Sequence, residues 1–215
     1  VMIDESHKMR MEGQNGLLKT LEEPPSYINI ILITPNGNNL IPTILSRCQR
    51  ITFYPIENKK IEDLLISNYN KTIEEAKFIS HFTKGSVGKS ITLSQSEDFF
   101  EKRDQTLKII DGIVNGDKLK IFTSIDFFTK NKDSYEEILD IFLYWFRDLI
   151  IYKEIGESEF IINMDKTSLL SNQSFLSINK INDIIESIME TKKSIDRNIN
   201  YQLAIETMLL SMQEV

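Results

Sequence analysis

Two acidic side chains follow the apolar start of the sequence, and their position suggests metal and nucleotide chemistry. Residues 1–3 read Val-Met-Ile, which is typical of a buried strand, and Asp4 and Glu5 come directly after them. Nucleotides bind at the carboxyl ends of parallel strands in open α/β sheets. There one carboxylate can help to hold Mg²⁺ while a second orients the attacking water. Apolar runs that end in acids are also common by chance, so the pair alone leaves both interpretations open.

A second stretch, at residues 85–90, imitates the end of a phosphate-binding loop. It reads Gly-Ser-Val-Gly-Lys-Ser, but the loop requires a glycine five positions before Gly88, where this sequence has Thr83. The stretch is also predicted to follow a helix, whereas a phosphate-binding loop follows a strand. We therefore expect no nucleotide to be cradled here.

The first of three predicted parts, residues 1–55, reads as α/β. Residues 11–23 are predicted to form a helix that ends at two prolines, because proline lacks an N–H and clashes with the preceding turn. Residues 28–33 are apolar apart from Asn29 and have strand length, and they are expected to form a strand buried on both faces.

The end of this part is predicted to hold a short helix and a third strand. Pro42 suits the first turn of a helix at residues 43–47. Ile51 and Phe53 alternate with polar neighbours, which is the pattern of a strand with one buried face.

Residues 56–95 are predicted to form three short helices. Asn58 can cap the first helix, and Thr72 with Glu75 has the spacing of a capping box for the second. Gly85 stands where the end of a helix favours a left-handed residue, and the third helix is expected to begin just after it.

Residues 96–215 are helical by pattern. Ser134 and Glu137 have capping-box spacing at the start of a helix that Gly156 would close. The apolar positions of this helix follow the 3.6-residue period. They are Ile138, Leu139, Phe142, Trp145, Phe146 and Leu149.

A second apolar face places the same helix at the centre of a bundle. Its members are Ile141, Leu143, Tyr144, Ile150 and Ile151. Two more helices are expected, at residues 178–199 and 201–212, with Asn200 as the cap of the last one.

Three motifs, in this order, resemble the clamp-loader branch of the AAA+ family. Residues 3–9 and 15–25 read Ile-Asp-Glu-Ser-His-Lys-Met and Asn-Gly-Leu-Leu-Lys-Thr-Leu-Glu-Glu-Pro-Pro. Residues 31–34, Ile-Leu-Ile-Thr, are similar to the family's sensor-1 strand. Residues 42–49, Pro-Thr-Ile-Leu-Ser-Arg-Cys-Gln, contain its Ser-Arg-Cys motif. The resemblance extends over nearly all of the 215 residues.

The resemblance implies a role for each candidate site residue. Arg47 would be a trans-acting arginine finger, whose always-charged guanidinium stabilises the phosphoryl group of ATP bound by the neighbouring subunit. Thr34 would be the sensor-1 residue. Asp4 and Glu5 would be a Walker B-like pair or the vestige of one. Without the family, Arg47 reads as an ordinary arginine at the end of a helix.

Within that family, the resemblance is to the delta-prime type of subunit. Gly88 stands where motor subunits carry the sensor-2 arginine, and Lys8 also departs from the motor pattern, whereas His7 agrees with it. The chain is then expected to bind no cofactor itself, with ATP and Mg²⁺ at the neighbouring subunit. The implied partners are the gamma/tau motor subunits and the delta subunit, with the sliding clamp and primed DNA reached indirectly.

The same resemblance implies a mostly α fold in three domains. Residues 1–55 would be the C-terminal half of an AAA+ α/β domain, a truncated remnant that lacks the Walker A half. Residues 56–95 would be a three-helix lid, and residues 96–215 an all-α helical collar used for oligomerisation. Because a missing strand would split the sheet and bare strand edges, residues 1–55 are expected to be the least stable part.

Composition excludes several other classes of protein. The net charge is -7, and residues 96–215 hold fourteen basic and twenty-two acidic side chains, so a dense basic DNA-binding surface is not expected. The single cysteine, Cys48, cannot form an internal disulfide or a zinc site with His7 and His81 alone. No signal-peptide pattern or membrane-span pattern is found, and a reducing cytoplasm is the expected location.

Three other functions are alternatives to that of a delta-prime type of subunit, which would hold the ring and donate Arg47 without hydrolysing ATP. A gamma/tau-type motor ATPase of the same complex would need a Walker A loop upstream. A DExH helicase would share residues 4–7, Asp-Glu-Ser-His, but it would continue into a second α/β domain instead of helices. A helical scaffold of unrelated function would not require the three motifs to occur together.

Overall fold

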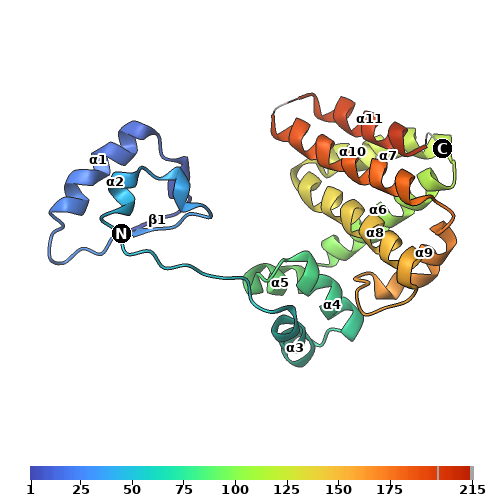
Figure 1. Ribbon diagram of the computed structural model, residues 1–215, viewed down its shortest axis with the longest axis horizontal. Coiled ribbons are helices and arrows are strands. Elements are labelled where there is room, and N and C mark those ends of the chain that lie inside the picture. The colour runs from blue at the N-terminus through green and yellow to red at the C-terminus, as the bar shows by residue number, and fades with distance from the viewer. Residues whose placement is uncertain (198, 214–215) are drawn as a thin grey trace. The chain divides into compact units, whose positions relative to one another are not determined.

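The computed structural model describes residues 1–197 and 199–213 and divides into two compact units, Val1–Tyr54 and Pro55–Val215. The part of the chain that is described contains eleven α-helices and one two-stranded sheet, so the fold is mostly α, as predicted. Figure 1 shows the elements of each unit.

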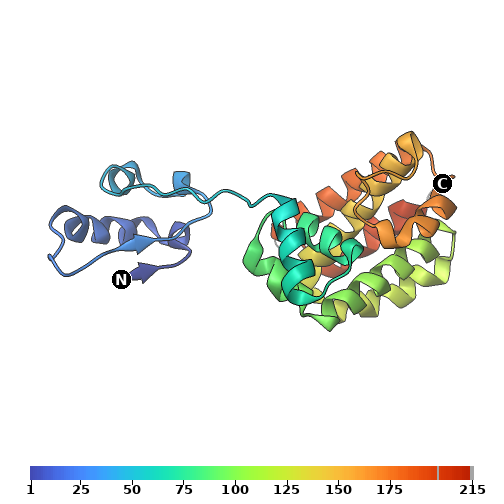
Figure 2. The same cartoon turned by 90° about the horizontal axis from the view of Figure 1, so that it is seen from below.

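The first unit is a small βαβ arrangement. Its elements are β1 (Met2–Ile3), η1 (Ser6–Lys8), α1 (Met11–Glu22), β2 (Ile31–Leu32), η2 (Gly37–Asn39) and α2 (Pro42–Leu45). The strands pair in parallel, with Met2 opposite Ile31 and Ile3 opposite Leu32, and they lie side by side in Figure 2. Parallel strands need a long crossover, and α1 supplies it.

Two strand predictions in this unit were wrong. The run at residues 28–33 is not buried on both faces: only Ile31 and Leu32 lie in the sheet, and Ile31 is 50% exposed. Ile51 and Phe53 form no strand and are 71% and 91% exposed. The described sheet has only two strands, so the backbone at residues 51–53 has no neighbouring strand with which to pair.

Three short helices begin the second unit, and they are capped largely as predicted. They are α3 (Asn58–Tyr69), α4 (Ile73–Phe82) and α5 (Val87–Ser94). Thr72 and Glu75 form both bonds of the capping box of α4. The capping role of Asn58 was wrong by one position, since Glu57 is the N-cap of α3 and makes no side-chain bond there.

The remaining helices of the second unit form a bundle. They are α6 (Glu97–Val114), α7 (Lys118–Lys130), η3 (Lys132–Ser134), α8 (Tyr135–Ile155), η4 (Met164–Lys166), α9 (Thr167–Gln173), α10 (Ile178–Asp196) and α11 (Tyr201–Gln213). Five of them close a ring, in which α8 packs on α6 and α10, α11 packs on α10 and α7, and α6 packs on α7 (Figure 1). Helix α9 lies against α8 and α6.

Helix α8 is the central helix that its two apolar faces predicted. All six residues of the first face are at most 1% exposed, and Ile141 of the second face is 2% exposed. The other four residues of the second face are partly buried against the same core. This core runs continuously from α3 to α11, which explains why residues 55–215 fold as one compact unit.

The predicted caps in the bundle differ in outcome. The Oδ1 atom of Asn200 accepts a hydrogen bond of 3.1 Å from the Leu203 amide, as expected of a cap. Ser134 precedes α8 but makes no capping bond; its hydroxyl instead accepts a hydrogen bond of 3.1 Å from Lys102 Nζ. None of the helices in residues 1–197 and 199–213 is long and apolar enough to cross a membrane.

Candidate functional site

The structure places three of the four predicted site residues at one edge of the small sheet. Asp4 and Glu5 follow β1 directly, and Thr34 comes two residues after the end of β2. Because the strands are parallel and in register, their carboxyl ends meet at the same edge. The Ser6 amide extends this pairing with a hydrogen bond of 2.8 Å to the Ile33 carbonyl.

The two acids at this edge have partners within the chain. Asp4 Oδ1 accepts a hydrogen bond of 2.8 Å from the Glu5 amide, and Glu5 Oε2 lies 2.5 Å from Lys8 Nζ in an exposed ion pair. Glu5 also has a φ of 46°, an uncommon conformation for a residue other than glycine. The Lys8 ammonium pairs with Glu5 and not with Asp4, and both side chains of the pair are exposed, so the role of Asp4 and Glu5 as a Walker B-like pair stays a prediction.

The Thr34 hydroxyl is engaged in a local turn. It donates a hydrogen bond of 2.9 Å to the Asn36 carbonyl and accepts one of 3.2 Å from the Asn36 amide. This turn fixes the direction in which the chain leaves β2. The hydroxyl would have to exchange these bonds to contact a ligand.

Arg47 lies just beyond α2 and is held on the surface of its own unit. One terminal nitrogen, Nη1, donates to the Thr43 carbonyl at 2.9 Å and to Ser46 Oγ at 3.3 Å. The other, Nη2, lies 2.6 Å from Glu22 Oε1 at the end of α1. The Arg47 side chain is 35% exposed and the Glu22 side chain 51% exposed, so the guanidinium has an internal partner and remains accessible.

Two residues that the sequence did not single out support this arrangement. Glu22 was only part of a family motif, and its pairing with Arg47 has no local sequence signal. Gln14 of α1 is 5% exposed; its Oε1 accepts from the Ile41 amide at 2.9 Å, and its Nε2 donates to the Met9 carbonyl at 3.1 Å. Gln14 thereby fixes α1 to the residue that precedes α2.

The stretch at residues 85–90 does not form a phosphate cradle. Gly85 has a φ of +83° and ends the turn between α4 and α5, while the Ser86 hydroxyl caps α5. Ser90 is fully buried and shares a hydrogen bond of 2.6 Å with Thr83. These side chains are therefore engaged in helix capping and packing.

A buried polar network occupies the second unit. Arg103 of α6 is 4% exposed; its guanidinium bonds both carboxylate oxygens of Asp165, at 2.7 and 2.8 Å, and Asn163 Oδ1 at 2.8 Å. It also stacks on the Phe78 ring of α4, 4.0 Å from the ring centroid. Asn163 in turn donates to the carboxylate of Asp148 in α8.

The two carboxylates of this network have opposite pKa shifts. Burial raises the pKa of Asp148 above its usual range, although bonds from Asn163, Arg147 and Ile162 act in the other direction. Burial also acts to raise the pKa of Asp165, but the bonds and charge of Arg103, with Lys166, outweigh it and lower that pKa. Both carboxylates of this network are hydrogen-bonded, and of the Arg103 nitrogens only Nε is buried without a partner, so the network serves to join α6, α8 and η4.

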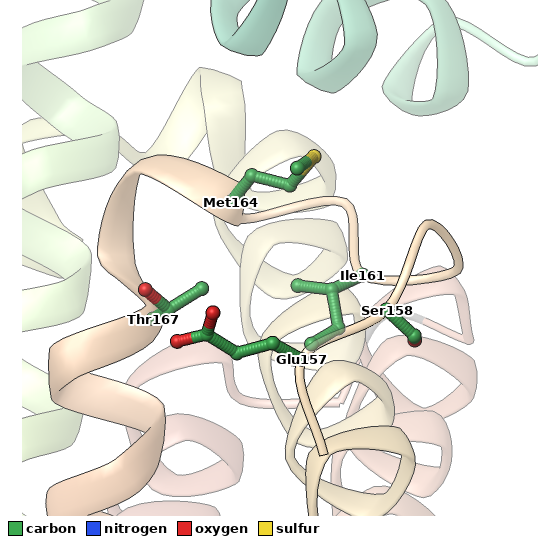
Figure 3. A pocket seen from close by; sticks show the side chains of 5 residues that line it. All are labelled: Glu157, Ser158, Ile161, Met164 and Thr167. Atoms are coloured by element: carbon green, nitrogen blue, oxygen red, sulfur yellow. The ribbon is translucent and has the colours of Figure 1, made fainter. Parts of the chain in front are cut away.

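A shallow cavity of about 280 Å³ lies in the connection between α8 and α9. Figure 3 shows Glu157 turned toward Thr167, while Ser158 points away; Ile161 and Met164 complete the lining. Among the described residues, no group of three or more His, Cys, Asp or Glu side chains is placed to hold a metal ion. The residues that line the cavity do not form a catalytic arrangement.

Comparison with known proteins adds family information to this geometry. Residues 1–57 match the family model described as "DNA polymerase III, delta subunit", and residues 97–214 match "DNA polymerase III, delta subunit, C terminal". The DNA polymerase III subunit delta' of Bacillus subtilis is 30% identical, over 99% of this chain and 65% of that protein.

Subunits named gamma and tau are also similar to the chain. The DNA polymerase III subunit gamma of Buchnera aphidicola (subsp. Baizongia pistaciae) is 27% identical, over 98% of this chain and 64% of that protein. The subunit tau of Bacillus subtilis is 30% identical, over 71% of this chain and 31% of that protein. The chain thus spans slightly less than two thirds of the delta' and gamma subunits that it matches.

Proposed function

We propose, from the premise that this chain belongs to the DNA polymerase III delta' subunit family, that it works in the bacterial clamp loader. In this role it assists the ATP-driven loading of the sliding clamp on primed DNA. It contributes to ring assembly and donates an arginine in trans, and it need not hydrolyse ATP itself. The observation that carries the proposal is the similarity to a delta' subunit along 99% of the chain.

The proposal also assigns the parts of the chain. Residues 1–55 are the C-terminal half of an AAA+ α/β domain, residues 56–95 are a lid, and residues 96–215 are a collar for oligomerisation. The partners are the gamma/tau motor subunits and the delta subunit, with the clamp and DNA contacted indirectly. The location that this replication role requires is the cytoplasm.

The surface of the second unit supports a role in assembly. Helices α7 and α11 pack against each other, and each leaves large apolar side chains mostly exposed. Leu119 and Phe122 of α7 are 73% and 72% exposed, and Leu203 and Leu210 of α11 are 58% and 50% exposed. Exposed apolar side chains of this kind favour contact with another protein surface.

Arg47 is the residue proposed to act on the neighbouring subunit. Negative charge on the transferred phosphoryl group is stabilised by a planar, always-charged guanidinium that can bind two oxygens at once. The partial exposure of the Arg47 side chain is consistent with this role, because the group can leave its present partners without unfolding the unit.

The proposal is tested by Arg47→Ala in a reconstituted clamp loader that contains the full protein. Arginine fingers supply about 10³–10⁵ in rate in GTPases, so ATP turnover at the one site that Arg47 faces should fall by roughly 10²-fold or more. Single-turnover ATP hydrolysis with primed DNA and clamp measures this change, and size-exclusion chromatography should show an intact complex.

Arg50→Ala is the matched control. Arg50 is exposed, stands three residues away and carries the same charge, and its guanidinium packs beside Gly37. Its replacement should leave turnover close to wild type. Turnover that is equal in Arg47→Ala and Arg50→Ala would contradict the finger role.

A motor ATPase of the same complex is the second candidate function. The similarity to gamma and tau subunits and the His7 residue favour it. The two functions differ in whether this protein binds ATP on its own. Titration of the purified full protein with a fluorescent ATP analogue distinguishes them, since saturable binding with hydrolysis supports the motor function.

A further inference from the structure

We propose that Glu22 is a positioning residue for Arg47: it holds the guanidinium in a resting state and must release it before Arg47 can reach a phosphate. This inference rests on the proposed function of Arg47 as a trans-acting finger. It adds a second residue, on a different helix, to the control of the same reaction.

The contact geometry defines the resting state. A guanidinium has five N–H donors. In Arg47, Nη1 is used by the Thr43 carbonyl and the Ser46 hydroxyl, which both belong to the end of α2. Nη2 is used by Glu22, the last residue of α1, at 2.6 Å. Glu22 is therefore the one of these three partners that comes from outside the segment carrying Arg47, and the one with a charge.

The position of Glu22 on α1 explains why it needs a cation. The carboxyl end of a helix carries partial negative charge, so an acid in its last turn is unfavourable there and a base is favourable. Arg47, which lies just beyond α2, supplies a positive charge directly to Glu22, in addition to Lys19 in the last turn of α1. Glu23, next in sequence, is the C-cap of α1 and forms no ion pair with Arg47 in the described contacts.

The same pair must be easy to separate. Both side chains are partly exposed, and exposed ion pairs are weak because water screens them. A phosphoryl group carries more charge than one carboxylate and can accept a bidentate pair of hydrogen bonds. Glu22 therefore competes with the phosphate, and its negative charge lowers the fraction of Arg47 that is free to cross to the neighbouring subunit.

The test compares Glu22→Gln with Glu23→Gln in the reconstituted complex. The amide in E22Q keeps the shape of the side chain but removes the charge. We expect E22Q to raise ATP turnover without DNA by up to about fivefold, the upper end of what an exposed ion pair can supply. The gain should appear in kcat, because the nucleotide is bound by the neighbour, and it should shrink at 0.5 M salt because screening weakens the wild-type pair.

Two controls make the result specific. E23Q removes the same charge one residue away and should leave turnover unchanged. The double variant E22Q/R47A should match R47A, because Glu22 acts only through Arg47. Turnover in E22Q that is equal to or below wild type, or a gain that persists in E22Q/R47A, would overturn the inference.

A second measurement tests the pairing without reference to hydrolysis. In the full protein by itself, ¹⁵N NMR of the arginine side chains should show the Arg47 signals shifting, and its guanidinium rotating faster, in E22Q but not in E23Q. Unchanged Arg47 signals in E22Q would refute the pairing of Glu22 with Arg47, but they would not bear on the finger function. Wild-type turnover in R47A would instead refute the finger function on which the inference rests.

Discussion

Gly85 shows how a single backbone conformation fixes a turn in this protein. Its φ of +83° lies in the region that favours glycine. A Cβ atom at this position would lie 2.5 Å from Pro55 Cβ and 2.8 Å from the Ile56 carbonyl oxygen. The Ile56 amide also donates a hydrogen bond of 3.0 Å to the Gly85 carbonyl, so the segment before α3 cannot simply move away.

Gly85→Ala is therefore expected to destabilise the second unit. The strained φ and the clash with backbone atoms together should cost about 3 kcal/mol of unfolding free energy. Urea denaturation followed by circular dichroism measures the change.

Gly88→Ala is the matched control for this substitution. Gly88 lies within α5, and nothing would lie within 4 Å of its added Cβ. Because alanine favours a helix, this variant should be more stable than wild type by about 0.5–1 kcal/mol. Equal stability of the two alanine variants would contradict the role given to Gly85.

At the scale of elements, the polar network around Arg103 joins helices that are far apart in sequence. Its guanidinium connects α6 to Asp165 in η4 and packs on Phe78 of α4. Lys77 of α4 also donates a hydrogen bond to the carbonyl of Glu159, in the connection that follows α8. Buried charges of this kind are retained only where each finds partners, because an unpaired buried charge costs several kcal/mol.

The raised pKa of Asp148 predicts a pH dependence with a definite sign. Its folded pKa lies above the ordinary value of 3.8, because burial disfavours the charged form. Its favourable contribution to stability is therefore complete below pH 3.8 and is lost as the pH rises through the raised pKa. Asp148→Asn does not titrate, so its stability relative to wild type should increase as the pH rises from about 4.

Asp165→Asn provides the opposite case. Because Arg103 and Lys166 lower the pKa of Asp165, its contribution is present above pH 3.8 and is lost as the pH falls through the lowered value. The wild-type advantage over Asp165→Asn should therefore grow as the pH rises through the lowered pKa toward 3.8. Urea denaturation between pH 2.5 and 7 tests both variants, and a difference for Asp148→Asn that does not change with pH would contradict the assignment.

At the scale of the whole molecule, the two units differ in how much apolar core they contain. Among the described residues of the first unit, only Leu40 and Ile44 are buried hydrophobic side chains. The second unit holds a continuous core that includes Trp145, Phe142 and Phe128. Since apolar burial is the main stabilising term, the first unit is expected to be the less stable of the two.

Limited proteolysis should separate the units. Phe53 and Tyr54 are 91% and 79% exposed and lie in a segment without helix or strand. Chymotrypsin should cut after Phe53, because Pro55 protects the bond after Tyr54, and should leave a resistant fragment that begins at residue 54. Mass spectrometry identifies the product.

Phe53→Ser is the control for that experiment and should delay cleavage there. The first unit should then be degraded before the second. A time course in which the fragment of residues 1–53 persists longest would contradict the expected order of stability.

Local features were the ones that could be predicted from the sequence. The capping box at Thr72 and Glu75, the left-handed turn at Gly85 and the apolar faces of α8 depend on residues only a few positions apart. Hydrogen bonds and side-chain periodicity act over that range. The order of the motifs likewise indicated the family to which the chain belongs.

Tertiary structure alone decided which partner each polar group takes. Arg47 pairs with Glu22 across 25 residues, Arg103 with Asp165 across 62, and Lys102 takes the Ser134 hydroxyl that the sequence assigned to a cap. The strand expected at Ile51 and Phe53 did not form, because a strand needs a neighbour as well as a pattern. Such outcomes depend on which distant segments packing brings together, and that is a property of the folded chain.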